Sequence, residues 1–190
     1  MECDNFEQNL PQEPVGLKED EKEEFWSFYV DDADELGNRF PQIMRYSLFV
    51  YSYSFFERTL INISYRFYQL EKLATPPPDR EKMGIEEAKN YLKKIALVPF
   101  PTNSAWRVIK TLNRVRNVVV HKEGVLPREV SKEEKAIQAL PKKWRDDISL
   151  ESYKIEFSPE FIFHVLDTFH AFFDELFLCL QSSRGTEDVV

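Results

Sequence analysis

Apolar side chains recur at helical spacing through most of this 190-residue chain, and that repeat limits its fold more than any other feature. The last long segment shows it best, with apolar residues at Ile162, Val165, Leu166, Phe169, Phe173, Leu176, Phe177 and Leu180. Ser158 and Pro159, just before this stripe, form a helix start. Only five glycines are present, which fits a helical protein better than a turn-rich β protein. We therefore predict an all-α, up-and-down bundle with four to five main helices.

The same spacing predicts the earlier helices of the bundle. One covers about residues 19–37, a longer one opens at Pro41 and extends to about Leu73, and a shorter one covers 85–96. The long helix is apolar on two sides. Such a helix lies at the centre of its bundle or lines a subunit contact.

About thirty residues separate Gly124 from the last helix, and a segment of this length usually has structure or a function of its own. We predict a short helix over 133–140 and a small hairpin over 148–157 within it. The segment also contains a basic cluster, 135–145, around Trp144. This cluster either contacts RNA and stacks a base, or forms a solvated face anchored by Trp144.

Charge divides the chain into an acidic arm and a nearly neutral body. The net charge is −8, and the first 24 residues hold nine acidic and two basic residues, so the remainder carries −1. We predict a flexible acidic arm over 1–19, which docks on a basic surface, one domain over 20–182, and a flexible tail over 183–190. A neutral body permits a local basic patch and argues against strong non-specific binding to duplex nucleic acid.

Several classes of protein do not fit the sequence. Two cysteines, Cys3 and Cys179, make no disulfide framework, so we expect free thiols in the cytoplasm. Charged residues interrupt the most apolar run, 161–180, and the acidic start lacks the positive end of a signal peptide, so we expect no membrane span and no export. No cysteine or histidine spacing predicts a metal site, and glycine-rich phosphate loops are missing, so we expect neither metal nor cofactor.

Most of the candidate chemistry lies in a helix that Gly124 ends. On a helical wheel, one face of this helix carries Ala105, Val108, Ile109, Leu112, Val119 and Val120. Arg116 falls in the middle of that face, whereas His121 projects from the opposite side. A buried arginine is costly unless it is paired. Arg116 therefore either forms a structural ion pair or belongs to a site where an arginine and a histidine meet a phosphate.

The stretch Arg116-Asn117-Val118-Val119-Val120-His121 matches an Arg-Asn-x-x-x-His signature, and with it the chain resembles the HEPN domains, small helical bundles of which many are ribonucleases. The resemblance covers about residues 24–182 in element order. It implies a metal-independent endoribonuclease, acting as a toxin or phage-defence effector, that leaves a 2′,3′-cyclic phosphate and a 5′-hydroxyl. It also implies a homodimer with both signatures facing one cleft, and an antitoxin or defence complex as partner.

The resemblance assigns roles to the signature residues. His121 would transfer protons, for which histidine is well suited near neutral pH. Arg116 would hold the non-bridging phosphate oxygens in its planar fork. Asn117 would hydrogen-bond within the site and steer His121, or else cap the helix end.

Residues outside the signature complete the candidate site. Lys110, Arg114 and Lys122 lie on the polar side of the helix and are candidates for RNA contacts. Glu57, in the middle of the long helix, is the first candidate partner for Arg116. The alternative for Glu57 is an ordinary solvated carboxylate.

Spacing raises a geometric problem for this site. Arg116 and His121 are five residues apart, which separates them by about 140° around a straight helix. Either the helix unwinds between Val118 and His121, where three valines favour it poorly, or a two-fold interface assembles the site. Glu123 stands where some HEPN toxins carry a tyrosine that is silenced by nucleotide addition, so that control is not expected. The alternative to an enzyme is a catalytically silent helical dimerisation or interaction module.

Overall fold

A computed structural model describes residues 16, 18, 21–27, 35–127 and 132–184. The chain falls into two units, Met1–Ile43 and Met44–Val190. The second unit is a bundle of helices with one small antiparallel hairpin before the last helix. This confirms the predicted all-α fold class.

The first unit contains a helical stretch at 21–27 and a π-helix, η3 (Glu35–Arg39), that leads directly into α2 (Phe40–Leu70). Gly37 lies inside η3, so the predicted helix end at this glycine is wrong, as is the predicted start at Pro41. Residues 28–34 and nearly all of the predicted acidic arm lie outside the described residues.

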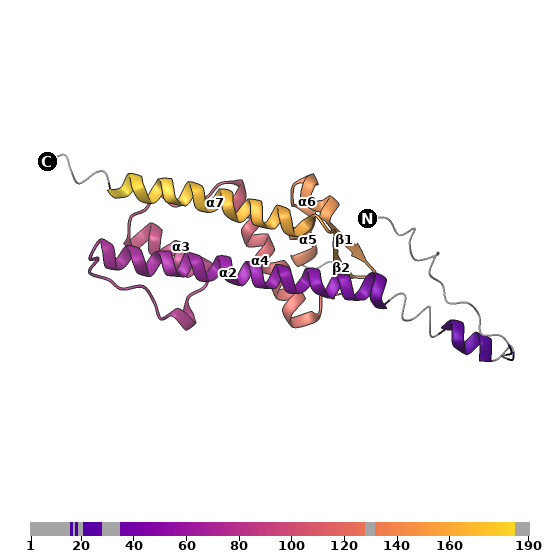
Figure 1. Ribbon diagram of the computed structural model, residues 1–190. Helices are drawn as coiled ribbons and strands as arrows, with labels where there is room; N and C mark the ends of the chain where they lie inside the picture. Colours follow the sequence, from indigo (N-terminus) through magenta and orange to yellow (C-terminus); the bar gives the residue numbers. More distant parts are fainter. Residues whose placement is uncertain (1–15, 17, 19–20, 28–34, 128–131, 185–190) are drawn as a thin grey trace. The chain divides into compact units, whose positions relative to one another are not determined.

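The core of the second unit is built on α2 and α7 (Phe161–Arg184). The ring of Phe49 lies 5.2 Å from that of Phe161, and Phe56 lies 5.5 Å from Phe172. Later residues of α2 thus contact later residues of α7, so the two helices run in the same direction (Figure 1). Because α7 continues to Arg184, the first two residues of the predicted tail are helical, and the rest lie outside the described residues.

Two shorter stretches complete the helical layer. A 3₁₀ turn, η4 (Arg80–Lys82), precedes α3 (Ile85–Asn90), and α3 continues as the π-helix η5 (Tyr91–Ile95). Together α3 and η5 form the helix predicted over 85–96.

The helix that carries the signature is α4 (Ser104–Lys122). Asn103 caps it, since its side chain accepts a hydrogen bond of 3.1 Å from the Trp106 amide. At this end the Trp106 ring contacts Phe172, whereas the other end of α4 reaches Tyr46 near the start of α2. Helix α4 therefore advances in the opposite sense to α2 and α7.

The insert between α4 and α7 contains α5 (Lys132–Gln138), α6 (Lys142–Asp147), and the strands β1 (Ile148–Glu151) and β2 (Lys154–Phe157). The strands pair antiparallel, with Ile148 opposite Phe157. The short helix and the hairpin are as predicted, and α6 was not predicted. Trp144 is only 4% exposed and packs on Phe161, so the predicted alternative in which it stacks an RNA base is wrong. No helix in the described part of the chain is both long and apolar enough to cross a membrane.

Candidate functional site

The C-terminal end of α4 stays helical through the whole signature. Helix α4 ends only at Lys122, and Glu123 then takes a left-handed conformation, with φ 52° and ψ 32°. The amides of Glu123 and Gly124 both donate to the Val118 carbonyl, which satisfies the helix end. Of the two predicted alternatives, unwinding between Val118 and His121 is therefore wrong, and assembly across a two-fold interface stays a prediction.

A close contact with α2 and the hairpin fixes this helix end. The Tyr46 hydroxyl donates to the Ile155 carbonyl, and the Ile155 amide donates to the Gly124 carbonyl at 2.9 Å. Gly124 has φ +81°, and a Cβ atom there would run into the Tyr46 ring. The site therefore requires glycine for its backbone conformation and for its space.

Arg116 lies at the edge of the buried face of α4. The fully buried positions of α4 are Trp106, Val108, Ile109, Leu112, Val115, Val118 and Val119. The structure thus corrects two expectations, because Arg116 is half-buried rather than central and Val120 is 44% exposed. The guanidinium donates to the Asn117 side-chain oxygen at 3.0 Å. Its Nε atom is buried and has no hydrogen-bond partner among the described residues.

Glu57 is the acidic residue of α2 that lies near Arg116. Burial raises the pKa of the Glu57 carboxyl, the positive charge of Arg116 lowers it, and the negative charge of Glu87 raises it again. A hydrogen bond from the Ile85 backbone lowers it further. The predicted neighbours are thus close enough to interact, although no ion pair within 4.0 Å joins them in the described structure. Burial also raises the pKa of the adjacent Tyr53 hydroxyl.

The remaining signature groups lie apart from Arg116. His121 is exposed on α4, and its ring makes no hydrogen bond to any residue that the structure describes. Asn117 contacts Arg116, so any role toward His121 stays a prediction. Lys110, Arg114 and Lys122 are also exposed, as the helical wheel predicted. One copy of the chain does not bring the arginine and the histidine together.

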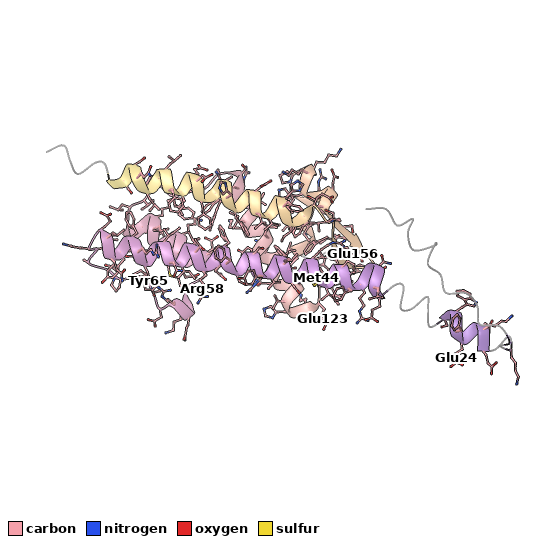
Figure 2. The ribbon with its side chains drawn as sticks, in the orientation of Figure 1. Glu24, Met44, Arg58, Tyr65, Glu123 and Glu156 are labelled. Carbon is pink, nitrogen blue, oxygen red and sulfur yellow. The ribbon has the colours of Figure 1, made fainter. Side chains whose placement is uncertain are left out.

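A polar groove of about 560 Å³ opens beside Glu57, between α2 and the segment 80–84. Arg58 contributes a cation to it that has no hydrogen bond or ion pair within the described chain. Arg80 is held in place, because it lies 4.4 Å from the Tyr65 ring centroid and donates to Asn62 at 2.7 Å. Figure 2 shows Arg58 and Tyr65 on the side of α2 that faces the 80–82 turn.

Sequence reasoning did not identify the cations of this groove, Arg58, Arg80 and Lys82. Arg58 directly follows Glu57, and this adjacency was the one available signal. The other two lie 22 and 24 residues further along the chain, in a loop whose packing no local pattern specifies.

Comparison with known protein families, with curated proteins and with solved structures found no match to this chain. The HEPN resemblance therefore rests on the signature and the order of elements. Within the described ranges, no group of three or more histidine, cysteine, aspartate or glutamate side chains is placed to hold a metal ion.

Proposed function

We propose that the protein is a metal-independent endoribonuclease of the HEPN type, a toxin or phage-defence effector that cleaves single-stranded RNA as a homodimer in the cytoplasm. The observation that carries this proposal is Arg116, a half-buried guanidinium held by Asn117 with a buried N–H that no described residue accepts. Such a group matches a phosphate oxygen, since guanidinium forms directed hydrogen bonds to phosphate. His121 lies on the same helix and is free to contact a ligand.

The reaction needs proton transfers and charge stabilisation, with no added oxidant or co-reactant. The ribose 2′-oxygen loses its proton to one His121 and forms a bond to phosphorus, while the bond from phosphorus to the 5′-oxygen breaks. A second His121, from the other copy, protonates the leaving 5′-oxygen. Arg116 neutralises the charge that builds on the non-bridging oxygens. The products are a 2′,3′-cyclic phosphate and a 5′-hydroxyl.

Exposed cations beside the site support binding of a single strand. Lys110, Arg114 and Lys122 would contact phosphates on the α4 side, and Arg58 would do so from the groove. The net charge of −8 disfavours a long duplex, because binding energy from released counterions needs many such contacts. An antitoxin or a defence complex would restrain the enzyme.

Incubation of the purified protein with labelled single-stranded RNA in EDTA tests the proposal. Cleavage with cyclic-phosphate ends is expected, and His121→Ala should abolish it while the unfolding curve stays unchanged. The matched control is His170→Ala, because His170 is 82% exposed on α7 and contacts only Asp174, at 3.1 Å, among described residues. Cleavage that survives His121→Ala, or that is lost equally in the control, contradicts the proposed mechanism.

A catalytically silent interaction module is the second candidate. The proximity of Arg116 to Glu57 favours it, because a charge near a buried carboxyl is a common structural arrangement. This candidate predicts that Arg116→Ala costs about 3 kcal/mol of stability while no RNA is cleaved by the unmodified protein. The nuclease predicts loss of cleavage in this variant, whatever the stability cost.

A further inference from the structure

An exposed apolar stripe runs along α2 on the side away from the core. Met44, Leu48, Tyr51 and Phe55 form it, and they are 47%, 49%, 75% and 64% exposed. Their spacing of four, three and four residues places them within about 60° of one another on the helix. The buried face of the same helix carries Phe49, Tyr53, Phe56 and Leu60, each 0% exposed. Core packing therefore does not account for the stripe.

The stripe is also free of charge. No charged residue occurs from Tyr46 to Phe56, and the exposed positions that flank the stripe are Ser47 and Ser54. A solvated helix face normally carries charged side chains, and serines are small enough to let another helix approach closely. Four large apolar side chains expose roughly 400 Å² together, a patch of the size that usually marks an interaction site.

We propose that a second copy of this chain covers the stripe, with the two α2 helices antiparallel. The two-fold axis passes between the two helices, at the level of Phe49 and Val50 along each helix. This register pairs Met44 with Phe55 of the other copy, and Leu48 with Tyr51. All four stripe residues then find an apolar partner, because the stripe is symmetric about its own centre. Self-complementarity of this kind is what a two-fold contact requires.

The flanking residues fit the same register. Ser47 and Ser54 lie on one flank of the stripe and meet each other across the contact, whereas Arg45 meets Ser52 on the other flank. No like charges face one another across the axis, so the contact carries no electrostatic penalty.

The axis falls level with the signature. Gly124 contacts Tyr46, and α4 runs opposite to α2, so His121 lies about one turn further along α2, near residue 49. Figure 2 likewise shows Glu123 beside the half of α2 that begins at Met44. Arg116 lies further along, near Tyr53 and Glu57.

Helix α4 contacts α2 through Tyr46, Tyr53 and Glu57, on the side of α2 away from the stripe. The surface and its register are therefore independent of the proposed nuclease function.

Cysteine cross-linking tests the register in a Cys3→Ser/Cys179→Ser background. A mixture of Met44→Cys and Phe55→Cys proteins should form an intermolecular disulfide on mild oxidation. Met44→Cys alone should not, because the two copies of this residue lie about 16 Å apart along the helices and a disulfide needs Cα atoms within about 7 Å. Self-cross-linking of Met44→Cys, which a parallel pair predicts, overturns the proposed register.

Oligomeric state and activity test the surface. Sedimentation should show a dimer, and Leu48→Glu/Tyr51→Glu should raise its dissociation constant roughly a hundredfold or more by burying charge. The control is Phe163→Glu, at an apolar position of α7 that is 64% exposed, and it should remain dimeric. A wild-type monomer at every concentration, a dimer that tolerates both stripe charges, or capture of a different protein by a monomeric chain overturns the inference.

Cross-linking and cleavage, measured on the same proteins, separate this inference from the proposed function. Dimers with the expected cross-link but no RNA cleavage would retain the surface and reject the nuclease. Cleavage by a monomeric Leu48→Glu/Tyr51→Glu protein would retain the nuclease and reject the surface.

Discussion

Substitution of Gly124 by alanine tests how the end of α4 is held against α2. Gly124 has φ +81°, a conformation that costs an L-residue about 1 kcal/mol. An added Cβ would also lie 2.8 Å from Cζ and 3.2 Å from Cε2 of Tyr46, and closer still to its hydroxyl oxygen. The contacts with Cζ and the hydroxyl oxygen are too short for any Cβ atom, so either the Tyr46 ring or the helix end must move.

Movement of Tyr46 removes two interactions. Its hydroxyl hydrogen bond to the Ile155 carbonyl is worth about 1 kcal/mol net. Its edge-to-face contact with Phe157, at 5.3 Å and 78°, is worth about another 1 kcal/mol. With the backbone strain included, we expect Gly124→Ala to lower the free energy of unfolding by about 3 kcal/mol.

Urea unfolding followed by circular dichroism measures this loss, and a double-mutant cycle locates it. In a Tyr46→Ala background the added methyl group has no ring to meet, so Gly124→Ala should cost only the backbone strain of about 1 kcal/mol. The matched control is Gly37→Ala, because no atom lies within 4 Å of a Cβ at Gly37. That helical position should tolerate alanine or gain about 0.5 kcal/mol.

Two results would refute this reasoning. A Gly124→Ala protein within about 0.5 kcal/mol of wild type would mean that neither the left-handed conformation nor the ring contact is costly. An equal loss in the Tyr46→Ala background would mean that Tyr46 does not set the cost.

Three further predictions concern the insert, the site carboxyl and assembly. Asp147 is 7% exposed, accepts a hydrogen bond from Ser158 Oγ at 2.8 Å and contacts His164. Asp147→Ala should therefore lower the free energy of unfolding in urea by about 3 kcal/mol. The control is Asp146→Ala, at the exposed neighbouring residue, which should cost almost nothing. Because the pKa of Glu57 is raised in the folded state, its ionisation at rising pH favours the unfolded chain. Glu57→Gln lacks this loss, so the unfolding free energy of the variant should rise relative to that of wild type between pH 4 and pH 7. A difference that stays constant with pH would contradict the raised pKa. If the site needs two copies, activity per milligram should fall when the enzyme is diluted below its dimer dissociation constant, and activity independent of dilution would contradict a composite site.

The helices were predictable because their pattern is local and their cause is burial. The repeat in α7 marks the positions that pack on α2, and the cap at Asn103 makes its contact only three residues away, at Trp106. Helix α6 was missed because its six residues, Lys142–Asp147, contain one large apolar side chain. Contacts far along the chain, from Trp144 to Phe161 and from Asp147 to Ser158, hold that helix in place.

The candidate site was predictable in part. The spacing on α4 correctly placed Lys110, Arg114 and His121 in solvent. It placed Arg116 too deep, because a helical wheel ranks residues by angle and does not show where the neighbouring helices end. Val120 is exposed for the same reason, since the last turn of α4 extends beyond the core. The groove beside Glu57 depends on a loop return of more than twenty residues, which no periodicity encodes.

Helix α2 has a buried face that packs in the core and an exposed apolar face that the proposed assembly would cover. Phe49, Tyr53 and Phe56 supply the aromatic contacts to α7, which would remain if the outer face were polar. A monomer would gain solubility from charges at Leu48 and Tyr51 without loss of core packing. Their absence favours the proposed two-fold contact, because a solvated helix face normally carries charged side chains. Since α4 is unbroken, the proposed nuclease needs a contact between two copies for Arg116 and His121 to act on one phosphate.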